Sequence, residues 1–133
     1  MFDPKSKILG IDYGDKRVGL SVAAFDSMAI PYTIIENKSF SFLLAELNKV
    51  IAEENITVVV VGLPRSLSGN SNERLVLTEK FITQLKQNLD LKIFTVDEQY
   101  TSKLYSQQGV KKDLDKYAAT AILETWLAQN HHA

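Results

Sequence analysis

The chain has 133 residues, a length that suits one domain, with 45% hydrophobic and 23% charged residues. This balance is typical of a globular protein, and a chain of this size buries roughly two thirds of its surface on folding. The net charge of −1 excludes a strongly basic field for nucleic acid, although small basic patches can suffice for binding.

The chain has no cysteine, which excludes disulfides and thiolate sites and agrees with a reducing cytoplasm. Its N-terminus lacks a signal-peptide pattern, and no apolar run approaches the roughly 20 residues needed to cross a bilayer. We therefore expect a single cytoplasmic domain over residues 1–133 that has no membrane partner.

The first apolar run, residues 8–11, ends abruptly in the carboxylate of Asp12. This pattern predicts a short buried strand, with Asp12 at the point where the strand leaves the core. Gly14 and Gly19 allow a tight reversal, and a second strand is predicted over residues 18–24. Taken alone, the stretch also fits an ordinary turn that is opened by an aspartate.

A third strand is predicted over residues 29–35, and Pro31 places it at a sheet edge. Ser39 is a candidate helix cap before a predicted helix that ends at about Glu54. The apolar stripe of this helix consists of Phe40, Leu43, Leu44, Leu47, Val50 and Ile51.

Residues 57–61 contain four valines and no charge, which predicts a strand covered on both faces, as in a parallel pair with helical crossovers. Asn70 and Glu73 resemble a capping box at the start of the next helix. The residues expected to form the buried edge of that helix are Leu77, Phe81, Leu85 and Leu89.

A fifth strand is predicted over residues 92–96 and ends in Asp97 and Glu98. The last predicted helix runs from about Leu114 to Gln129. The order β-β-β-α-β-α-β-α predicts an α/β fold with a mixed five-stranded sheet and helices on both faces. Right-handed crossovers place the fourth and fifth strands parallel to the first, on the side away from the hairpin.

The carboxyl ends of parallel strands meet at one edge of a sheet, and functional sites lie there. Asp12, Asp97 and Glu98 end such strands, and Asp115 starts the final helix. Converging carboxylates repel each other unless a cation joins them, and their oxygen atoms suit Mg²⁺ or Mn²⁺. Two such ions about 4 Å apart can promote phosphodiester hydrolysis. Zinc is disfavoured because no His or Cys is near these positions.

Helical spacing separates two neighbouring aspartates of the final helix. Asp115 is in line with an apolar stripe that is expected to pack on the sheet, formed by Ala118, Ala119, Ile122 and Trp126. Asp113 is in line with a polar row that is expected to face water, formed by Lys116, Thr120 and Glu124. Asp115 therefore points toward the strand ends, and Asp113 could cap the helix.

Several basic residues fall in predicted loops near the same strand ends. Each of them alone is more typical of a solvated surface charge, and only their shared location makes them candidate nucleic-acid contacts. The candidates are Lys16, Arg17, Arg65, Lys111 and Lys112.

Four segments together resemble the YqgF family of Holliday junction resolvases and pre-16S ribosomal RNA nucleases, which have a ribonuclease-H-like fold. The resemblance covers nearly the whole chain, and four motifs in order make it specific. The first motif is Ile8-Leu9-Gly10-Ile11-Asp12-Tyr13-Gly14 with Lys16-Arg17-Val18-Gly19, and the second is Val60-Val61-Gly62-Leu63-Pro64 with Gly69. The third is Val96-Asp97-Glu98 with Thr101-Ser102, and the last is Asp115 with Ala118-Ala119 and Ile122-Leu123.

The resemblance implies a hydrolase, a metal-dependent endonuclease that cleaves structured nucleic acid. Asp12, Glu98 and Asp115 match the positions that carry Mg²⁺ or Mn²⁺, and Asp97 is the second choice. The substrate is either precursor 16S rRNA, processed at its 5′ end during ribosome biogenesis, or a branched DNA junction. Ribosomal particles and a second copy of the chain are the implied partners.

Two residues depart from the family pattern. Gln99 stands where the family usually has arginine, which removes a possible phosphate contact. Asp15 stands where a small hydroxyl residue is common, which adds a negative charge near the site.

Two other classes of protein remain open. The first is a non-catalytic RNA- or ribosome-binding module of the same fold, which the slightly acidic balance and Gln99 favour. The second is a single ATP-binding lobe of the actin and sugar-kinase type, whose first loop also follows a strand with Asp-x-Gly, as in Asp12-Tyr13-Gly14. That class needs two lobes around a nucleotide, and 133 residues provide one.

Overall fold

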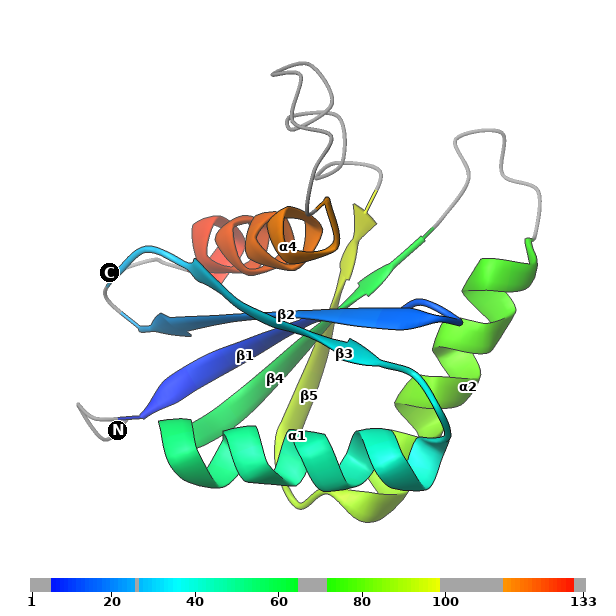
Figure 1. Cartoon of the computed structure of the whole chain (residues 1–133). Coiled ribbons are helices and arrows are strands. Elements are labelled where there is room, and N and C mark those ends of the chain that lie inside the picture. The colour runs from blue at the N-terminus through cyan, green and yellow to red at the C-terminus, as the bar shows by residue number, and fades with distance from the viewer. Residues whose placement is uncertain (1–5, 26, 65–71, 99–113, 131–133) are drawn as a thin grey trace.

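The computed structural model describes residues 6–25, 27–64, 72–98 and 114–130, with the side chains of 114–116 excepted. The described elements follow the predicted order of three strands and then alternating helices and strands (Figure 1). They are β1 (Lys7–Asp12), β2 (Arg17–Ala24), β3 (Ile30–Glu36), α1 (Phe40–Glu54), β4 (Ile56–Leu63), α2 (Glu73–Asn88), β5 (Lys92–Asp97) and α4 (Leu114–Asn130).

The five strands form one mixed sheet in the order β3-β2-β1-β4-β5. β2 is antiparallel to both β1 and β3, whereas β1, β4 and β5 run parallel. The predicted topology is therefore confirmed, with β3 and its Pro31 at an edge. Because β2 runs against β1, its first residue, Arg17, lies at the same edge of the sheet as Asp12.

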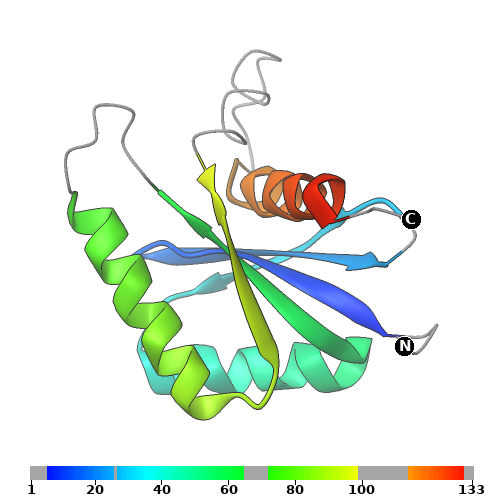
Figure 2. The same cartoon turned by 180° about the vertical axis from the view of Figure 1, so that it is seen from behind.

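Helices cover both faces of the sheet, as expected: α1 and α2 lie on one side and α4 on the other (Figures 1 and 2). Alternate residues of each strand supply the two faces. Leu9 and Val59 pack into the core under α1 and α2, whereas Ile8 and Val58 pack under α4. Both faces of β4 are buried, which explains its nearly continuous run of valines.

The boundaries of α1 are encoded locally. The Ser39 side chain caps the helix by accepting a hydrogen bond from the Phe42 amide at 3.1 Å. Asn55 ends the helix in the left-handed conformation, with φ of 54°. The predicted stripe is confirmed where it faces the sheet, at Leu43, Leu47 and Val50.

The predicted start and buried edge of α2 are partly wrong. The capping residue is Asn72, whose side chain accepts from the Leu75 amide at 2.7 Å, and not Asn70. Leu77 is 44% exposed. The side of α2 that faces the sheet is turned away from Leu77. The buried residues of the helix are Thr78, Phe81, Ile82 and Leu85.

The helix α4 packs closely on the sheet at a glycine. A Cβ atom on Gly10 would collide with the Ser21 hydroxyl and come within 2.6 Å of Leu123 Cγ. In the space so created, the Ser21 hydroxyl donates a hydrogen bond to the carbonyl oxygen of Ala119 at 2.7 Å. None of the described helices combines the length and hydropathy needed to cross a membrane.

The predicted apolar stripe of α4 is confirmed, because Ala119, Ile122 and Trp126 are buried. The predicted polar row is wrong at Thr120, which is only 4% exposed. The reason is that α4 contacts β1, β2 and β3, so the sheet buries more of the helix surface than the single predicted stripe.

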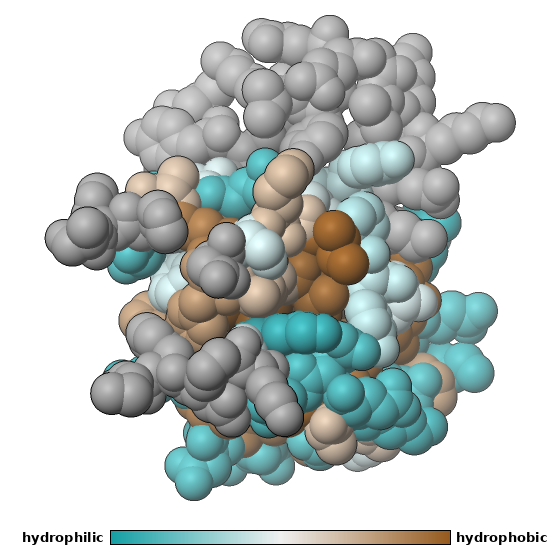
Figure 3. Space-filling model, turned by 90° about the vertical axis from the view of Figure 1, so that its left-hand side faces the viewer, coloured by the Kyte–Doolittle hydropathy of each residue, from teal (hydrophilic) through white to brown (hydrophobic). Residues whose placement is uncertain are grey.

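The amino ends of the parallel strands lie at the opposite end of the sheet from the three predicted carboxylate positions. Figure 3 shows this side, where hydrophilic residues gather below a smaller hydrophobic patch. Exposed hydrophobic residues among the described ones include Met28 and Ile30, next to the start of β3.

Candidate active site

The candidate site lies at the edge where the parallel strands β1, β4 and β5 end. Backbone pairing places Gly62 beside Val96, and Ile11 beside Val61, so Asp12 follows on the same level as Gly62. The described first turns of α4 point toward this edge in both views of the ribbon (Figures 1 and 2). The predicted convergence of strand ends is therefore present.

Asp12 is the last residue of β1 and is only 7% exposed. Strand alternation places it on the same face as Ile8 and Gly10, which is the face covered by α4. A carboxylate with so little exposure is costly unless charge or hydrogen bonding compensates for it. The buried Asp12 carboxylate therefore needs a cation or hydrogen-bond donors beside it.

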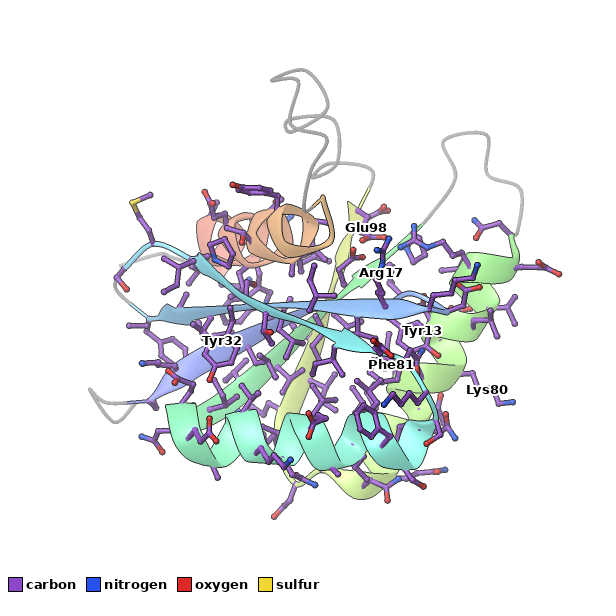
Figure 4. The ribbon with its side chains drawn as sticks, in the orientation of Figure 1. Tyr13, Arg17, Tyr32, Lys80, Phe81 and Glu98 are labelled. Atoms are coloured by element: carbon purple, nitrogen blue, oxygen red, sulfur yellow. The ribbon has the colours of Figure 1, made fainter. Side chains whose placement is uncertain are left out.

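Glu98 comes directly after β5 and is also 7% exposed. Its Cγ atom lies 2.8 Å from the position that a Cβ atom on Gly62 would occupy. Asp97 is partly exposed and pairs with Leu63 in the strand register. Figure 4 shows Glu98 at the same end of the sheet as Arg17. Of the two predicted carboxylates after this strand, Glu98 is the one packed over the gap that Gly62 leaves.

Asp115 lies in the first turn of α4, one turn before Ala119. The Ala119 carbonyl meets Ser21, and Ile122 packs against Gly62, so this helix runs across the face that carries Asp12. The Asp115 side chain lies outside the described residues. Its proposed part in the site stays a prediction that agrees with the course of the helix backbone.

The predicted basic residues divide into two groups. Lys16 and Arg17 are exposed at the turn between β1 and β2, beside the carboxylate edge. Asp15 is exposed in the same turn. The other residues of interest lie outside the described part of the chain: Arg65, Gln99, Lys111 and Lys112.

The turn that carries Lys16 is held by Asn37, a residue that we did not predict. The Asn37 side chain donates to the Gly14 carbonyl oxygen at 2.8 Å, and its amide donates to the Lys16 carbonyl oxygen at 2.9 Å. An asparagine directly after an edge strand gives no recognisable signal in a single sequence. Its role depends on the pairing of β2 with β3.

Arg74 is a second residue that we did not predict. Its Nη2 atom lies 3.4 Å from Asp12 Oδ1 and 3.4 Å from the Tyr13 carbonyl oxygen. The available signal was its place in the first turn of the helix that follows β4. A right-handed crossover starts such a helix near the carboxyl edge of the sheet.

The donor chemistry of the site fits a hard divalent cation. Asp12 and Glu98 offer carboxylate oxygens, the atoms that Mg²⁺ and Mn²⁺ prefer. Within the described side chains, no group of three Asp, Glu, His or Cys residues is placed to hold a metal ion. Asp115, whose side chain lies outside the described residues, stays the predicted third carboxylate.

A mixed sheet of this order with helices on both faces is a ribonuclease-H-like fold. Thermus thermophilus RuvC in complex with Holliday junction substrate has this fold, with a TM-score of 0.65 and 15% identity over 94% of this chain and 96% of that one. The yeast mitochondrial Holliday junction resolvase has it too, with a TM-score of 0.57 and 16% identity over 96% of this chain and 80% of its own.

The sequence model of the RuvX family, described as Holliday junction resolvase, matches residues 6–129. A protein of Maridesulfovibrio salexigens with the name "Putative pre-16S rRNA nuclease" is 37% identical over 92% of this chain and 98% of its own length. One of Sulfurihydrogenibium with the same name is 34% identical over 92% and 90%. The chain belongs to the RuvX family, also called YqgF, which confirms the family, fold and nuclease class indicated by the motifs.

Proposed function

We propose that this nuclease depends on a divalent metal ion, Mg²⁺ or Mn²⁺, held by Asp12, Glu98 and Asp115. The observation that carries the proposal is that two buried carboxylates, Asp12 and Glu98, lie at the same edge of the sheet, at the ends of β1 and β5 on either side of β4. Two carboxylates so placed repel each other, and a shared cation removes that repulsion. The oxygen-only donor set favours Mg²⁺ or Mn²⁺ over zinc.

The carboxylates and the basic residues would have different roles in phosphodiester hydrolysis. When bound, the divalent ion would offset the negative charge that builds up on the phosphate during hydrolysis. Asp12 and Glu98 would fix its position from strands whose ends are held by the sheet. Lys16 and Arg17, exposed beside them, would bind neighbouring phosphates and orient the nucleic acid.

The proposed substrate is the 5′ end of precursor 16S rRNA, processed in the cytoplasm on or near ribosomal particles. Two relatives that match over nine tenths of this chain carry the pre-16S rRNA nuclease name, which supports this choice. The family description supports a branched DNA junction as the alternative substrate. Cutting both strands of a junction requires two sites, so that activity would need a homodimer.

A cleavage assay on both substrates tests the proposal. Precursor 16S rRNA and a four-way DNA junction are incubated separately with the protein and Mg²⁺, Mn²⁺ or EDTA. We expect metal-dependent cleavage of the RNA that EDTA and Asp12→Asn both abolish. Cleavage of the junction alone would replace the RNA by DNA as the substrate.

A non-catalytic RNA-binding module is the second candidate. The net charge of −1 and the glutamine at position 99 favour it, because both weaken the expected phosphate contacts. In that case the protein and Asp12→Asn would bind the precursor RNA equally well, and neither would cleave it with any metal.

A further inference from the structure

The guanidinium group of Arg74 contacts the carboxylate of Asp12, which is one of the proposed metal ligands. The Nη2–Oδ1 distance is 3.4 Å, and the same Nη2 atom lies 3.4 Å from the Tyr13 carbonyl oxygen. The Arg74 side chain is 55% exposed, whereas that of Asp12 is 9% exposed. The contact therefore joins a buried carboxylate to a guanidinium group that is half exposed to solvent.

Hydrogen bonds hold the backbone around Arg74 in place, so a movement of Arg74 away from Asp12 would involve its side chain. The Asn72 side chain caps α2 and also donates to the Pro64 carbonyl oxygen at 3.1 Å, which ties the helix to the end of β4. The Thr78 hydroxyl, which is buried, donates to the Arg74 carbonyl oxygen at 2.7 Å. The long side chain can leave Asp12 while its Cα stays in place.

The end of β1 is tied to the same helix. The Tyr13 ring stacks on Phe81 of α2, with ring centroids 4.2 Å apart and an angle of 20° between the planes (Figure 4). This stack docks α2 beside Asp12 without help from the guanidinium. Arg74 is therefore not needed to hold the helix against the strand.

We propose that Arg74 is the counter-ion of Asp12 that a divalent metal ion displaces, so that Arg74 weakens and thereby sets the metal affinity of the site. A guanidinium and a metal ion on one carboxylate repel each other. Displacement is feasible because the guanidinium is half exposed and lies 3.4 Å from the carboxylate oxygen, too far for a strong ion pair. The inference rests on the proposed function, in which Asp12 binds the metal.

The test measures Mn²⁺ binding to the intact protein by calorimetry, without nucleic acid and at constant ionic strength. Arg74→Gln removes the charge and keeps a polar, though shorter, side chain. We expect its Kd for Mn²⁺ to be about three- to tenfold lower than that of the parent, a size that corresponds to a weak ion pair. Arg74→Lys keeps the charge and should stay within about twofold of the parent.

Lys80→Gln is the matched control, because it removes the same charge from the same helix. Lys80 is exposed and points away from the sheet in Figure 4. Its variant should bind Mn²⁺ with the parental Kd. Equal tightening in both glutamine variants would show a general effect of net charge and would overturn the proposal.

Unchanged or weaker Mn²⁺ binding by Arg74→Gln would also overturn it, and thermal melting would show whether that variant is folded. Asp12→Asn separates this failure from failure of the proposed function. If Asp12→Asn binds Mn²⁺ like the parent, the metal site is not at Asp12 and both ideas fail. If Asp12→Asn loses Mn²⁺ but Arg74→Gln does not gain affinity, only the role of Arg74 is wrong.

Discussion

The Cγ atom of Glu98 takes up the space that any side chain on Gly62 would require. A Cβ atom at position 62 would lie 2.8 Å from Glu98 Cγ and would also collide with the Cδ1 atom of Ile122. The end of β4 is therefore bare so that Glu98 and α4 can pack over it. Glycine at this position makes room for the site and is not required by a left-handed φ angle.

Gly62→Ala should lower both stability and cleavage. The added methyl group must displace Ile122 and Glu98, and overpacking of this kind costs about 1–3 kcal/mol. We expect a lower urea midpoint together with a large loss of metal-dependent cleavage. Parental cleavage by a folded Gly62→Ala protein would mean that the position of Glu98 does not matter for activity.

A second substitution separates the two effects of that methyl group. Ile122→Ala removes the colliding aliphatic atoms, so in the Gly62→Ala background it should cost less stability than it does alone. The conflict with Glu98 would remain. Cleavage should therefore stay low in the double variant even where stability is partly recovered.

Asp12→Asn should abolish cleavage and leave the fold intact. The amide keeps the shape of the carboxylate but is a poor ligand for a hard cation. The ion pair with Arg74 that it removes is half exposed, so the free energy of unfolding should change by no more than about 1 kcal/mol. Asp15→Asn, in the exposed turn that follows, is the control and should retain cleavage. Melting and cleavage measured on both variants decide the point.

Asn37→Ala should loosen the turn that carries Lys16. Removing the 2.8 Å hydrogen bond to the Gly14 carbonyl oxygen should cost about 1 kcal/mol and weaken binding of nucleic acid. Asn88→Ala is matched, because that side chain donates to the Gln84 carbonyl oxygen at 2.8 Å at the far end of α2. Fluorescence titration of RNA should show weaker binding for Asn37→Ala alone. Equal affinities would separate Asn37 from substrate binding.

Asp115→Asn and Asp113→Ala should have opposite effects. Asp115 occupies the first turn of α4, in line with Ala119, so its amide variant should lose cleavage with little change in stability. Asp113 directly precedes the helix in sequence, and its removal as a cap should cost about 1 kcal/mol while cleavage persists. Activity and melting of both variants test the pair. An essential Asp113 and a dispensable Asp115 would contradict the assigned third ligand.

The Lys111→Ala, Lys112→Ala double variant should bind nucleic acid with a weaker dependence on salt. If a lysine binds a phosphate, its removal lowers the magnitude of the log–log salt slope by about 0.9 for duplex DNA. Lys80→Ala, Lys86→Ala removes the same charge from the exposed side of α2 and should keep the parental slope. If the Lys111 and Lys112 variant also keeps it, those lysines are solvated surface charges.

Much of the fold was predictable because its signals are local. The charge-free valines of β4 and the Pro31 of β3 indicated a central and an edge strand, and both assignments are confirmed. The errors arose where tertiary packing decides. Thr120 is buried because α4 packs across several strands of the sheet, and Leu77 is exposed because the buried residues of α2 lie on a different side of the helix.

The same division applies to the candidate site. Topology alone brought Asp12 and Glu98 to one edge, because parallel strands end together. The contact between Arg74 and Asp12 joins residues 62 positions apart. It depends on where α2 starts, which the expected cap at Asn70 misplaced. Helix caps two residues apart are hard to distinguish in sequence, and they determine which side chain reaches the strand end.

The hydrogen bond from Ser21 to the Ala119 carbonyl oxygen spans 98 residues. Because β2 precedes α4 in the chain, the ribosome makes β2 first, and the face of the sheet that carries Ser21 has no helix to cover it until α4 docks. Docking of α4 covers that face of the sheet. It also brings the first turn of the helix, which contains Asp115, toward the strand ends. If Asp115 is the third ligand, as proposed, a nascent chain would lack the complete set of carboxylates, and the nuclease would become active only after its last helix has folded.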